Sequence, residues 1–206
     1  MAADGDERMR IIDAADRCLT ARDGATVSVT DILAEAGLST RAFYRHFESK
    51  DSLLLALFRR DSERLAAGLD SAVAAATSPD DALRRFVHGT LLLTAQAHLR
   101  QRVTIVMSEQ AQRARGFPAE RARFHARQEA AIAQILRQGR LDGTFPWARP
   151  EADARSIRGA LNQAFDDQMS GSATVTADEA AARIIDFVFR ALGAASAGPV
   201  GSPATD

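Results

Sequence analysis

The chain has 206 residues, of which 46% are hydrophobic and 26% charged, and this composition excludes a disordered chain. The net charge is −1, so the overall charge gives no argument for nucleic-acid binding. No apolar run is long enough to cross a bilayer, and a single cysteine, Cys18, excludes an internal disulfide. The polar, partly acidic N-terminus does not resemble a secretory signal, and we therefore expect a cytoplasmic protein.

Hydrophobic periodicity predicts helices along nearly the whole chain. The first helix is expected from Asp6 to Arg22, because Ile11, Ala15 and Cys18 recur at the three- to four-residue spacing of one buried face. Gly24 follows and is expected to end it. Cys18 belongs to this apolar stripe, which indicates a core residue rather than a redox sensor.

Two shorter helices follow, each with a recognisable start. Ser28 is placed to cap the second helix, and Asp31 stands three residues later, at the capping-box position. Gly37 supplies the backbone freedom to end that helix tightly. Ser39 then caps a third helix that runs to about Phe47. Two short helices joined by a tight glycine turn have the spacing of a helix-turn-helix, which places its second helix in the major groove of DNA.

The third helix has one apolar face and one polar face. Phe43 and Phe47 are one turn apart and are expected to point inward. The helical wheel then turns the other side outward, with Arg41, Ala42, Tyr44 and Arg45. A tyrosine between two arginines suits contacts with phosphates and bases. On an isolated helix, however, such a surface is more often a solvated face.

The stretch "SVTDILAEAGLSTRAFYRHFESKDSLL", residues 28–54, resembles the DNA-binding segment of the tetracycline-repressor-like (TetR) family of bacterial transcriptional regulators. The matching positions are Asp31, Ile32, Ala36, Gly37, Ser39, Tyr44, His46, Phe47, Ser49, Lys50, Leu53 and Leu54. As a cluster they form a specific pattern that covers about a quarter of the chain. The all-helical remainder also suits the family.

The resemblance implies roles for individual residues. It implies that Tyr44, His46 and Lys50 hold the DNA backbone, although a structural role for His46 beside Phe47 remains open. It implies base reading at Thr30, Thr40, Arg41 and Arg45, and a phosphate contact at Ser28. Many relatives carry threonine where this chain has Ala42, so a hydroxyl contact is missing there. The predicted DNA-contacting set is Ser28, Thr30, Ser39, Thr40, Arg41, Ala42, Tyr44, Arg45, His46 and Lys50.

Two other function classes compete with DNA binding. Residues 1–50 hold seven basic and nine acidic residues, which lends some support to a helix-turn-helix scaffold that binds a protein partner instead. A helical enzyme is the other alternative. The sequence offers no nucleophile–base grouping, phosphate loop or metal-ligand pattern, so we do not expect an enzyme. With this charge balance, affinity for unrelated DNA is expected to be weak and strongly reduced by salt.

The remainder of the chain is expected to be helical as well. A long fourth helix is predicted over residues 50–76, followed by helices at about 80–97, 101–114, 118–138, 151–170 and 177–192. The fold class is therefore all-α with about nine helices. We expect a DNA-binding domain at 1–50 and an effector-binding and dimerisation domain at 51–192, within which 51–76 is a connecting helix. A disordered tail is expected at 193–206.

The last two predicted helices are candidates for a dimer interface. TetR-like proteins generally pair through their two final helices, and a two-fold dimer would read two half-sites of a palindrome. Burial within the monomer is the alternative that the sequence leaves open. The candidate interface residues are Ile157, Leu161, Phe165, Ile184, Ile185, Val188, Phe189 and Leu192.

The resemblance also implies a pocket for a small-molecule effector, with a weak lean to apolar or amphipathic molecules. For each candidate residue, core packing is the competing explanation. His88 and His125 lack metal-ligand spacing, so neither a metal nor a cofactor is expected. The candidate pocket residues are Phe86, His88, Met107, Phe117, Phe124, His125, Trp147, Phe165 and Met169. The sequence thus predicts a homodimeric regulator that binds a DNA operator, more often a repressor than an activator in this family.

Overall fold

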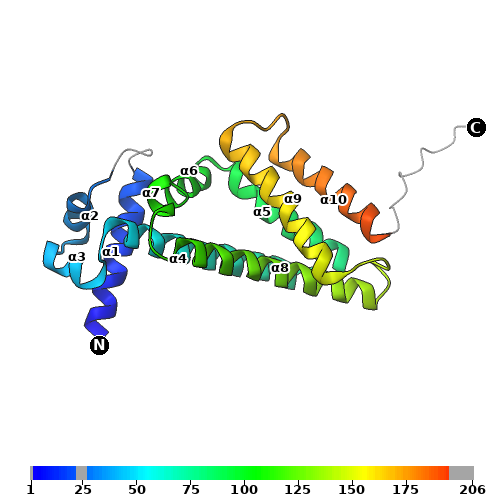
Figure 1. Ribbon diagram of the computed structural model, residues 1–206, viewed down its shortest axis with the longest axis horizontal. Helices are drawn as coiled ribbons and strands as arrows, with labels where there is room; N and C mark the ends of the chain where they lie inside the picture. The colour runs from blue at the N-terminus through cyan, green and yellow to red at the C-terminus, as the bar shows by residue number, and fades with distance from the viewer. Residues whose placement is uncertain (1, 22–26, 195–206) are drawn as a thin grey trace, which may run out of the picture. The chain divides into compact units, whose positions relative to one another are not determined.

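The computed structural model describes residues 2–21 and 27–194, and within them it confirms the all-α fold class. Ten helices occur in this part of the chain (Figure 1). They are α1 (Ala2–Ala21), α2 (Val29–Ala36), α3 (Thr40–His46), α4 (Lys50–Ala74), α5 (Pro79–Ala95), α6 (Ala97–Val106), α7 (Glu109–Gln112), α8 (Phe117–Leu141), α9 (Pro150–Ser170) and α10 (Ala177–Leu192).

The additional helix arises where one helix was predicted over 101–114. Met107 ends α6 with φ −101° and ψ 9°, outside the helical region. Ser108 then caps α7, because its side chain accepts a hydrogen bond from the backbone N–H of Ala111 at 3.3 Å. A serine that competes for backbone hydrogen bonds favours such a break, and the periodicity on either side does not reveal it. Helix α6 also begins earlier than expected, at Ala97.

The chain forms two compact units. The first contains residues 1–68 and 93–126, and the second contains residues 69–92 and 127–206. Helices α4, α5 and α8 therefore contribute residues to both. The predicted division at residue 50 concerns function and stays a prediction. Of the predicted tail, residues 195–206 lie outside the described part of the chain.

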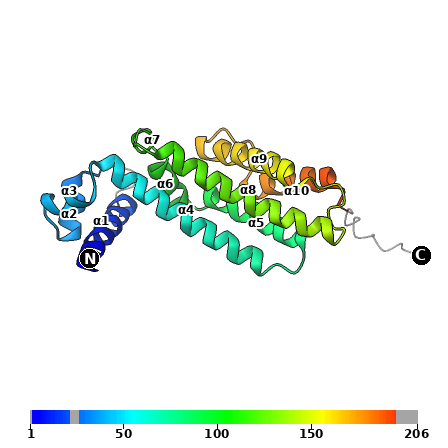
Figure 2. The ribbon, with the colours of Figure 1, turned by 60° about the horizontal axis from the view of Figure 1, so that its bottom comes forward.

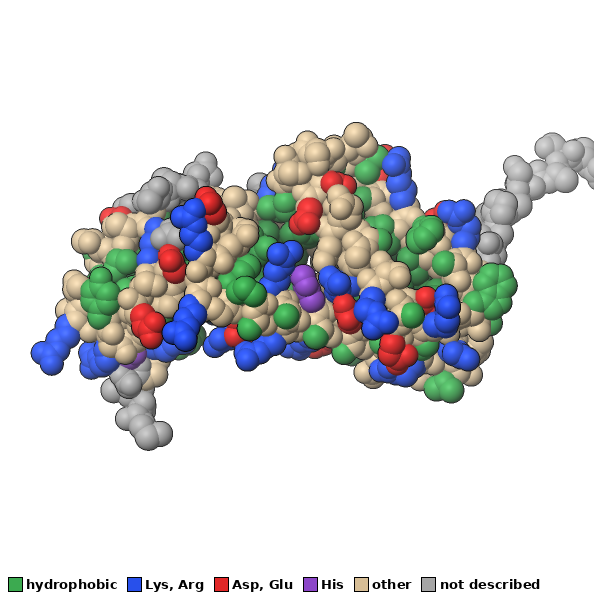
Figure 3. Space-filling view, in the orientation of Figure 1, with side chains coloured by type: hydrophobic (Ala, Val, Ile, Leu, Met, Phe, Trp, Pro, Cys, Tyr) green, Lys and Arg blue, Asp and Glu red, His purple; other side chains and the backbone are tan. Residues whose placement is uncertain are grey.

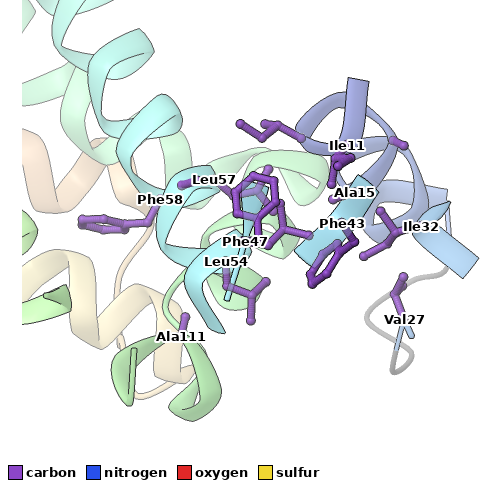
Figure 4. Close-up of a cluster of buried hydrophobic side chains, with 14 of the residues drawn as sticks. Ile11, Ala15, Val27, Ile32, Phe43, Phe47, Leu54, Leu57, Phe58 and Ala111 are labelled. Carbon is purple, nitrogen blue, oxygen red and sulfur yellow. The ribbon is translucent and has the colours of Figure 1, made fainter. Parts of the chain in front are cut away.

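The first unit has one hydrophobic core (Figure 4), in which α1, α2, α3 and α4 meet. Ile11, Ile32, Phe43 and Leu53 are at most 2% exposed. Ala111 of α7, Ala114 of the following turn and Phe117 at the start of α8 belong to the same core. The short helices α2 and α3 could not be stable alone in water, so this burial is what fixes them.

An ionic cluster joins α4 to α8 within the first unit. The Glu120 carboxylate accepts hydrogen bonds from Arg59 and, at 2.9 Å, from Arg123. The Glu120 side chain is only 10% exposed. The hydrogen bond from Arg59 lowers the pKa of Glu120 below its ordinary value, despite the opposing effect of burial.

The second unit is built around the α9–α10 pair, which lie side by side in two views (Figures 1 and 2). Arg84 of α5 stacks over the Phe189 ring of α10, with 4.4 Å from Cζ to the ring centroid. Phe145 is fully buried and packs so closely on Gly139 that a Cβ there would meet its ring at 2.2 Å. No described helix is long and apolar enough to cross a membrane.

Candidate nucleic-acid interface

Local hydrogen bonds set the geometry of the helix-turn-helix. Ser28 and Asp31 form the predicted capping box at the start of α2. Gly37 ends α2 with φ 62°, in the left-handed region that a glycine adopts without a Cβ penalty. Ser39 then caps α3 by accepting a hydrogen bond from the Ala42 N–H at 3.2 Å. These predictions from the sequence are confirmed.

The two faces of α3 differ sharply in exposure. Phe43 and Phe47 are 0% and 4% exposed, whereas Tyr44 is 63% exposed. Tyr44 rests edge-on against Phe43, with ring centroids 5.3 Å apart. Buried phenylalanines thus hold the helix while the tyrosine projects from it. The prediction that Ala42 points outward was wrong. Ala42 is 3% exposed and lies on the buried side of α3, beside Phe43.

The other predicted contacts occupy three positions along the motif. Arg41 and Thr40 are exposed at the start of α3, and Lys50 is partly exposed at the start of α4. Ser28 and Thr30 are exposed at the start of α2. These five side chains could reach phosphates or base edges of DNA. In such motifs, contacts with the DNA backbone and bases come from helix starts and from the outer face of the second helix.

Helix α1 fixes the motif through side chains that sequence reasoning did not single out. Arg10 donates to the Ala36 carbonyl at 2.7 Å, which satisfies an otherwise open acceptor at the end of α2. Arg17 pairs with Glu35 of α2 at 2.8 Å. Arg8 lies over the ring of Phe47, 5.2 Å from its centroid.

A second unexpected contact involves Glu7 of α1. Its Oε2 atom lies 3.0 Å from Arg45 Nη2 and 3.2 Å from His46 Nε2. The His46 side chain is 5% exposed. The free protein therefore turns His46 inward, toward α1, and the structural role that the sequence left open fits this position better than the implied phosphate contact. Glu7 is 39 positions from His46, and the sequence carries no signal that pairs them.

Charges around the motif are mixed. On the face that Figure 3 shows, basic side chains over α1, α2 and α3 are interspersed with acidic ones. The ion pairs of Arg17 with Glu35 and of Arg45 with Glu7 contribute to this pattern. Any DNA contact would therefore depend on a few placed side chains and not on a broad basic surface.

Comparisons with known proteins bear on this site directly. The sequence model described as "Bacterial regulatory proteins, tetR family" matches residues 11–57, which include α2, α3 and the start of α4. The N-terminal segment of this chain therefore carries the sequence pattern of the TetR family.

Two curated relatives show how far the similarity extends. The chain is 34% identical over 82 residues to the uncharacterized HTH-type transcriptional regulator Rv1255c of Mycobacterium tuberculosis, a match that covers 40% of this chain and 41% of that protein. The match thus spans about two fifths of the relative's length. BetI of Brucella melitensis, an HTH-type transcriptional regulator, is 27% identical over 172 residues, 82% of this chain and 87% of BetI.

Solved structures share the fold over most of the chain. The transcriptional regulator FadR from Bacillus subtilis, solved with stearoyl-CoA, has a TM-score of 0.68 at 16% identity and covers 89% of this chain and 98% of FadR. AibR, solved with isovaleryl coenzyme A and operator DNA, has a TM-score of 0.60 at 19% identity and covers 89% of this chain and 98% of AibR. At this identity the likeness establishes the fold alone.

The predicted effector-pocket residues fall in both compact units of the chain. Met107, Phe117, Phe124 and His125 belong to the first unit, and Phe86, His88, Trp147, Phe165 and Met169 to the second. Phe117 is 4% exposed, and its ring centroid lies 5.0 Å from that of Phe58, so core packing accounts for it. Phe86 is likewise buried. The pocket stays a prediction.

Trp147 and His88 also have local structural explanations. Trp147 is 69% exposed, and its backbone N–H donates to the Leu192 carbonyl at 3.1 Å. Its indole lies so close to Gly193 that a Cβ there would meet it at 2.5 Å. It therefore covers the end of α10. His88 is exposed, with Nδ1 3.8 Å from Asp178.

Most predicted dimer residues are buried inside the chain itself. The structure places them on the inner faces of α9 and α10, where they cannot also form an intermolecular surface: Ile157, Leu161, Ile185, Val188 and Leu192. Burial within the monomer, the alternative that the sequence left open, therefore accounts for these five residues, because each helix has a strongly apolar side that its own unit covers. Phe165, Ile184 and Phe189 are partly exposed, and Phe187 is 62% exposed.

One buried group in the second unit lacks a partner. Gln128 of α8 is 7% exposed, and its Oε1 makes no hydrogen bond with the described residues. By contrast, the equally buried Gln168 donates to the Val175 carbonyl at 2.7 Å. Among the described side chains, no group of three or more histidine, cysteine or acidic residues is placed to hold a metal ion.

Proposed function

We propose that this protein is a transcriptional regulator that binds a DNA operator through the outer face of α3. The observation that carries the proposal is the contrast between adjacent residues of α3: Phe43 is fully buried and Tyr44 is 63% exposed. An exposed tyrosine flanked by Arg41 and Arg45 on a rigidly held helix can enter a major groove. The AibR complex with operator DNA, a protein of the same fold, supports this assignment.

Individual contacts follow from the chemistry of the side chains. Arg41 presents a planar fork of donors that suits the O6 and N7 atoms of guanine, and Thr40 can contact a neighbouring base or phosphate. Tyr44 and Lys50 suit phosphate contacts. Because Lys50 is at the first position of α4, the helix N-terminus adds to the attraction for an anion.

The proposal includes a homodimer that reads a palindrome and acts as a repressor. A two-fold dimer places two copies of α3 on half-sites about one helical turn of DNA apart. Since the inner residues of α9 and α10 are already covered, the pairing surface would be their outer sides, which include the exposed Phe187. An exposed phenylalanine in a terminal helix is suited to such burial.

The proposal also includes release by a small molecule with a large apolar part. FadR was solved with stearoyl-CoA and AibR with isovaleryl coenzyme A, and both share this fold. The apolar residues predicted for the pocket suit such a molecule. Binding that favours a conformation unable to hold two half-sites would release the operator.

The proposal is tested by selecting bound duplexes from a random DNA library with the purified full chain at moderate salt, followed by sequencing. We expect an enriched palindrome and light scattering that reports a dimer. Folded protein that enriches no sequence would contradict operator binding. The scaffold that binds a protein partner would then explain better why residues 1–50 carry more acidic than basic residues.

A further inference from the structure

Glu7 makes a contact with α3 that differs from an ordinary surface ion pair. One carboxylate oxygen, Oε2, faces both Arg45 Nη2 at 3.0 Å and His46 Nε2 at 3.2 Å. Since a carboxylate oxygen accepts hydrogen bonds, Nε2 of His46 must carry a hydrogen in this arrangement. Glu7 therefore connects α1 to two consecutive residues of the helix proposed to read DNA.

The two partners differ in burial, and this difference decides what Glu7 can do. The His46 side chain is 5% exposed and is held inside, whereas the Arg45 side chain is 55% exposed. A carboxylate already fixed by a buried imidazole loses little further freedom when it binds a second donor. It can therefore hold the guanidinium of Arg45 in one orientation at small entropic cost.

The arrangement leaves most of the guanidinium available. Arginine carries five N–H donors in a planar fork, and Glu7 contacts one nitrogen, Nη2. A bidentate contact with guanine needs two N–H groups in one orientation, and the contact with Glu7 at Nη2 restricts the orientations that the guanidinium can adopt. A flexible arginine would have to lose its side-chain freedom on binding, which weakens discrimination between bases.

Placing a carboxylate here also has a cost. A negative charge beside a DNA-binding helix repels phosphates and lowers affinity for all DNA. If Glu7 only stabilised the fold, a neutral acceptor could hold His46 equally well. A negative charge is useful at this position if it orients a guanidinium, because the oriented guanidinium raises affinity for one sequence relative to others.

We propose that Glu7 is a positioning residue that orients Arg45 for recognition of one guanine in each half-site of the operator. This inference rests on the proposed function, because it requires that α3 reads DNA. It concerns discrimination between bases and predicts that Glu7 increases specificity while lowering general affinity for DNA.

The test compares Glu7→Ala with Glu35→Ala. Glu35 is a matched control because it also pairs α1 with the motif, through Arg17 at 2.8 Å, but it lies on α2 and its ion pair involves neither Arg45 nor His46. Each change removes one negative charge and puts alanine in a helix. Both variants should therefore bind unrelated DNA slightly more tightly than the wild-type protein.

The decisive readout is base preference at one position of the operator enriched by the wild-type chain. The position read by Arg45 is the one at which Arg45→Ala loses its guanine preference. Glu7→Ala should lower that preference about two- to fivefold, the range of a partly exposed ion pair. Glu35→Ala should leave it unchanged. In the Arg45→Ala background, adding Glu7→Ala should have no further effect on it.

Each outcome decides the question. If Glu7→Ala and Glu35→Ala show the same base preference, the proposal is overturned. A stronger preference in Glu7→Ala would also overturn it, because Glu7 would then hinder the base contact of Arg45. Should Glu7→Ala not fold, Glu7→Gln keeps an acceptor for His46 while removing the charge, and the same readout applies. A wild-type chain that enriches no DNA would refute the proposed function itself, which is a distinct result.

Discussion

Replacing Phe43 by alanine tests whether the buried face of α3 holds the motif in place. Phe43 is fully buried, with ring centroids 5.3 Å from Tyr44 and 5.7 Å from Phe47. Removing such a side chain costs about 3–5 kcal/mol, from lost burial and from the cavity that remains. This is a large share of the 5–15 kcal/mol that is typical for a whole domain. Because α7 and the start of α8 share this core, the entire first unit should lose stability.

The assay is urea denaturation followed by circular dichroism, with two companion variants. Phe43→Leu retains much of the buried volume and should cost roughly 1–1.5 kcal/mol. Tyr44→Ala changes the neighbouring residue, which is 63% exposed, and should cost about 1 kcal/mol or less, mainly from the lost edge-on ring contact. It should nevertheless weaken operator binding.

The reasoning would be refuted by a reversed order of these losses. If Tyr44→Ala destabilised the protein as much as Phe43→Ala, the assignment of buried and exposed faces would be wrong. A loss below about 1 kcal/mol for Phe43→Ala would show that this core does not hold the motif, since burial of a phenyl ring is worth more than that.

Three further predictions concern stability. Gly37→Ala should lower the free energy of unfolding by roughly 1–2 kcal/mol, because φ is 62° at this position. Gly68→Ala in α4 should raise it by about 0.5–1 kcal/mol, because a Cβ there meets nothing within 4 Å. Chemical denaturation of both variants tests these opposite signs. Glu120→Gln should cost about 1–2 kcal/mol at neutral pH, a value discounted because Arg59 is half exposed. The folded-state pKa of Glu120 is lowered, so its contribution should be complete above the ordinary pKa of 4.5 and be lost as pH falls from there through the lower folded-state pKa. Parallel stability curves for variant and wild type across that range would contradict this reasoning. Gln128→Leu should change stability by less than about 1 kcal/mol or increase it, because Oε1 has no partner among the described residues, while Gln168→Leu should cost about 1–2 kcal/mol through loss of its bond to Val175; thermal unfolding of the two variants distinguishes them.

The sequence predicted those features that depend on local spacing. Ser28, Gly37 and Ser39 mark helix boundaries because a cap or a left-handed residue acts on the next three or four residues. The buried positions of Phe43 and Phe47 follow from the helical period alone. The TetR resemblance rests on the same short stretch, so it was also visible without a structure.

Features that depend on how helices cross were not predictable. The contact of Glu7 with His46 joins residues 39 positions apart. It forms only if α1 packs against α3 with these two residues at the same level. The periodicity of α10 shows that it is apolar but not which element covers it. The sequence therefore left both a dimer interface and the chain's own core open for Ile185 and Val188, and the structure buries both within the chain. Ala42 was misplaced by one position on the wheel of a helix of only seven residues.

Equilibrium binding to the enriched palindrome, measured by fluorescence anisotropy, tests most directly the claim that the outer face of α3 reads DNA. The variants are Arg41→Ala and Tyr44→Ala, with Arg17→Ala as a control on the α1–α2 surface, where the Arg17 side chain is 58% exposed. We predict that Arg41→Ala loses about 1–3 kcal/mol of binding free energy and relaxes base preference at one position. Tyr44→Ala should weaken binding, and Arg17→Ala, which removes one exposed ion pair and one positive charge, should weaken it less than either of the other two changes. Wild-type affinity in folded Arg41→Ala and Tyr44→Ala would contradict the account.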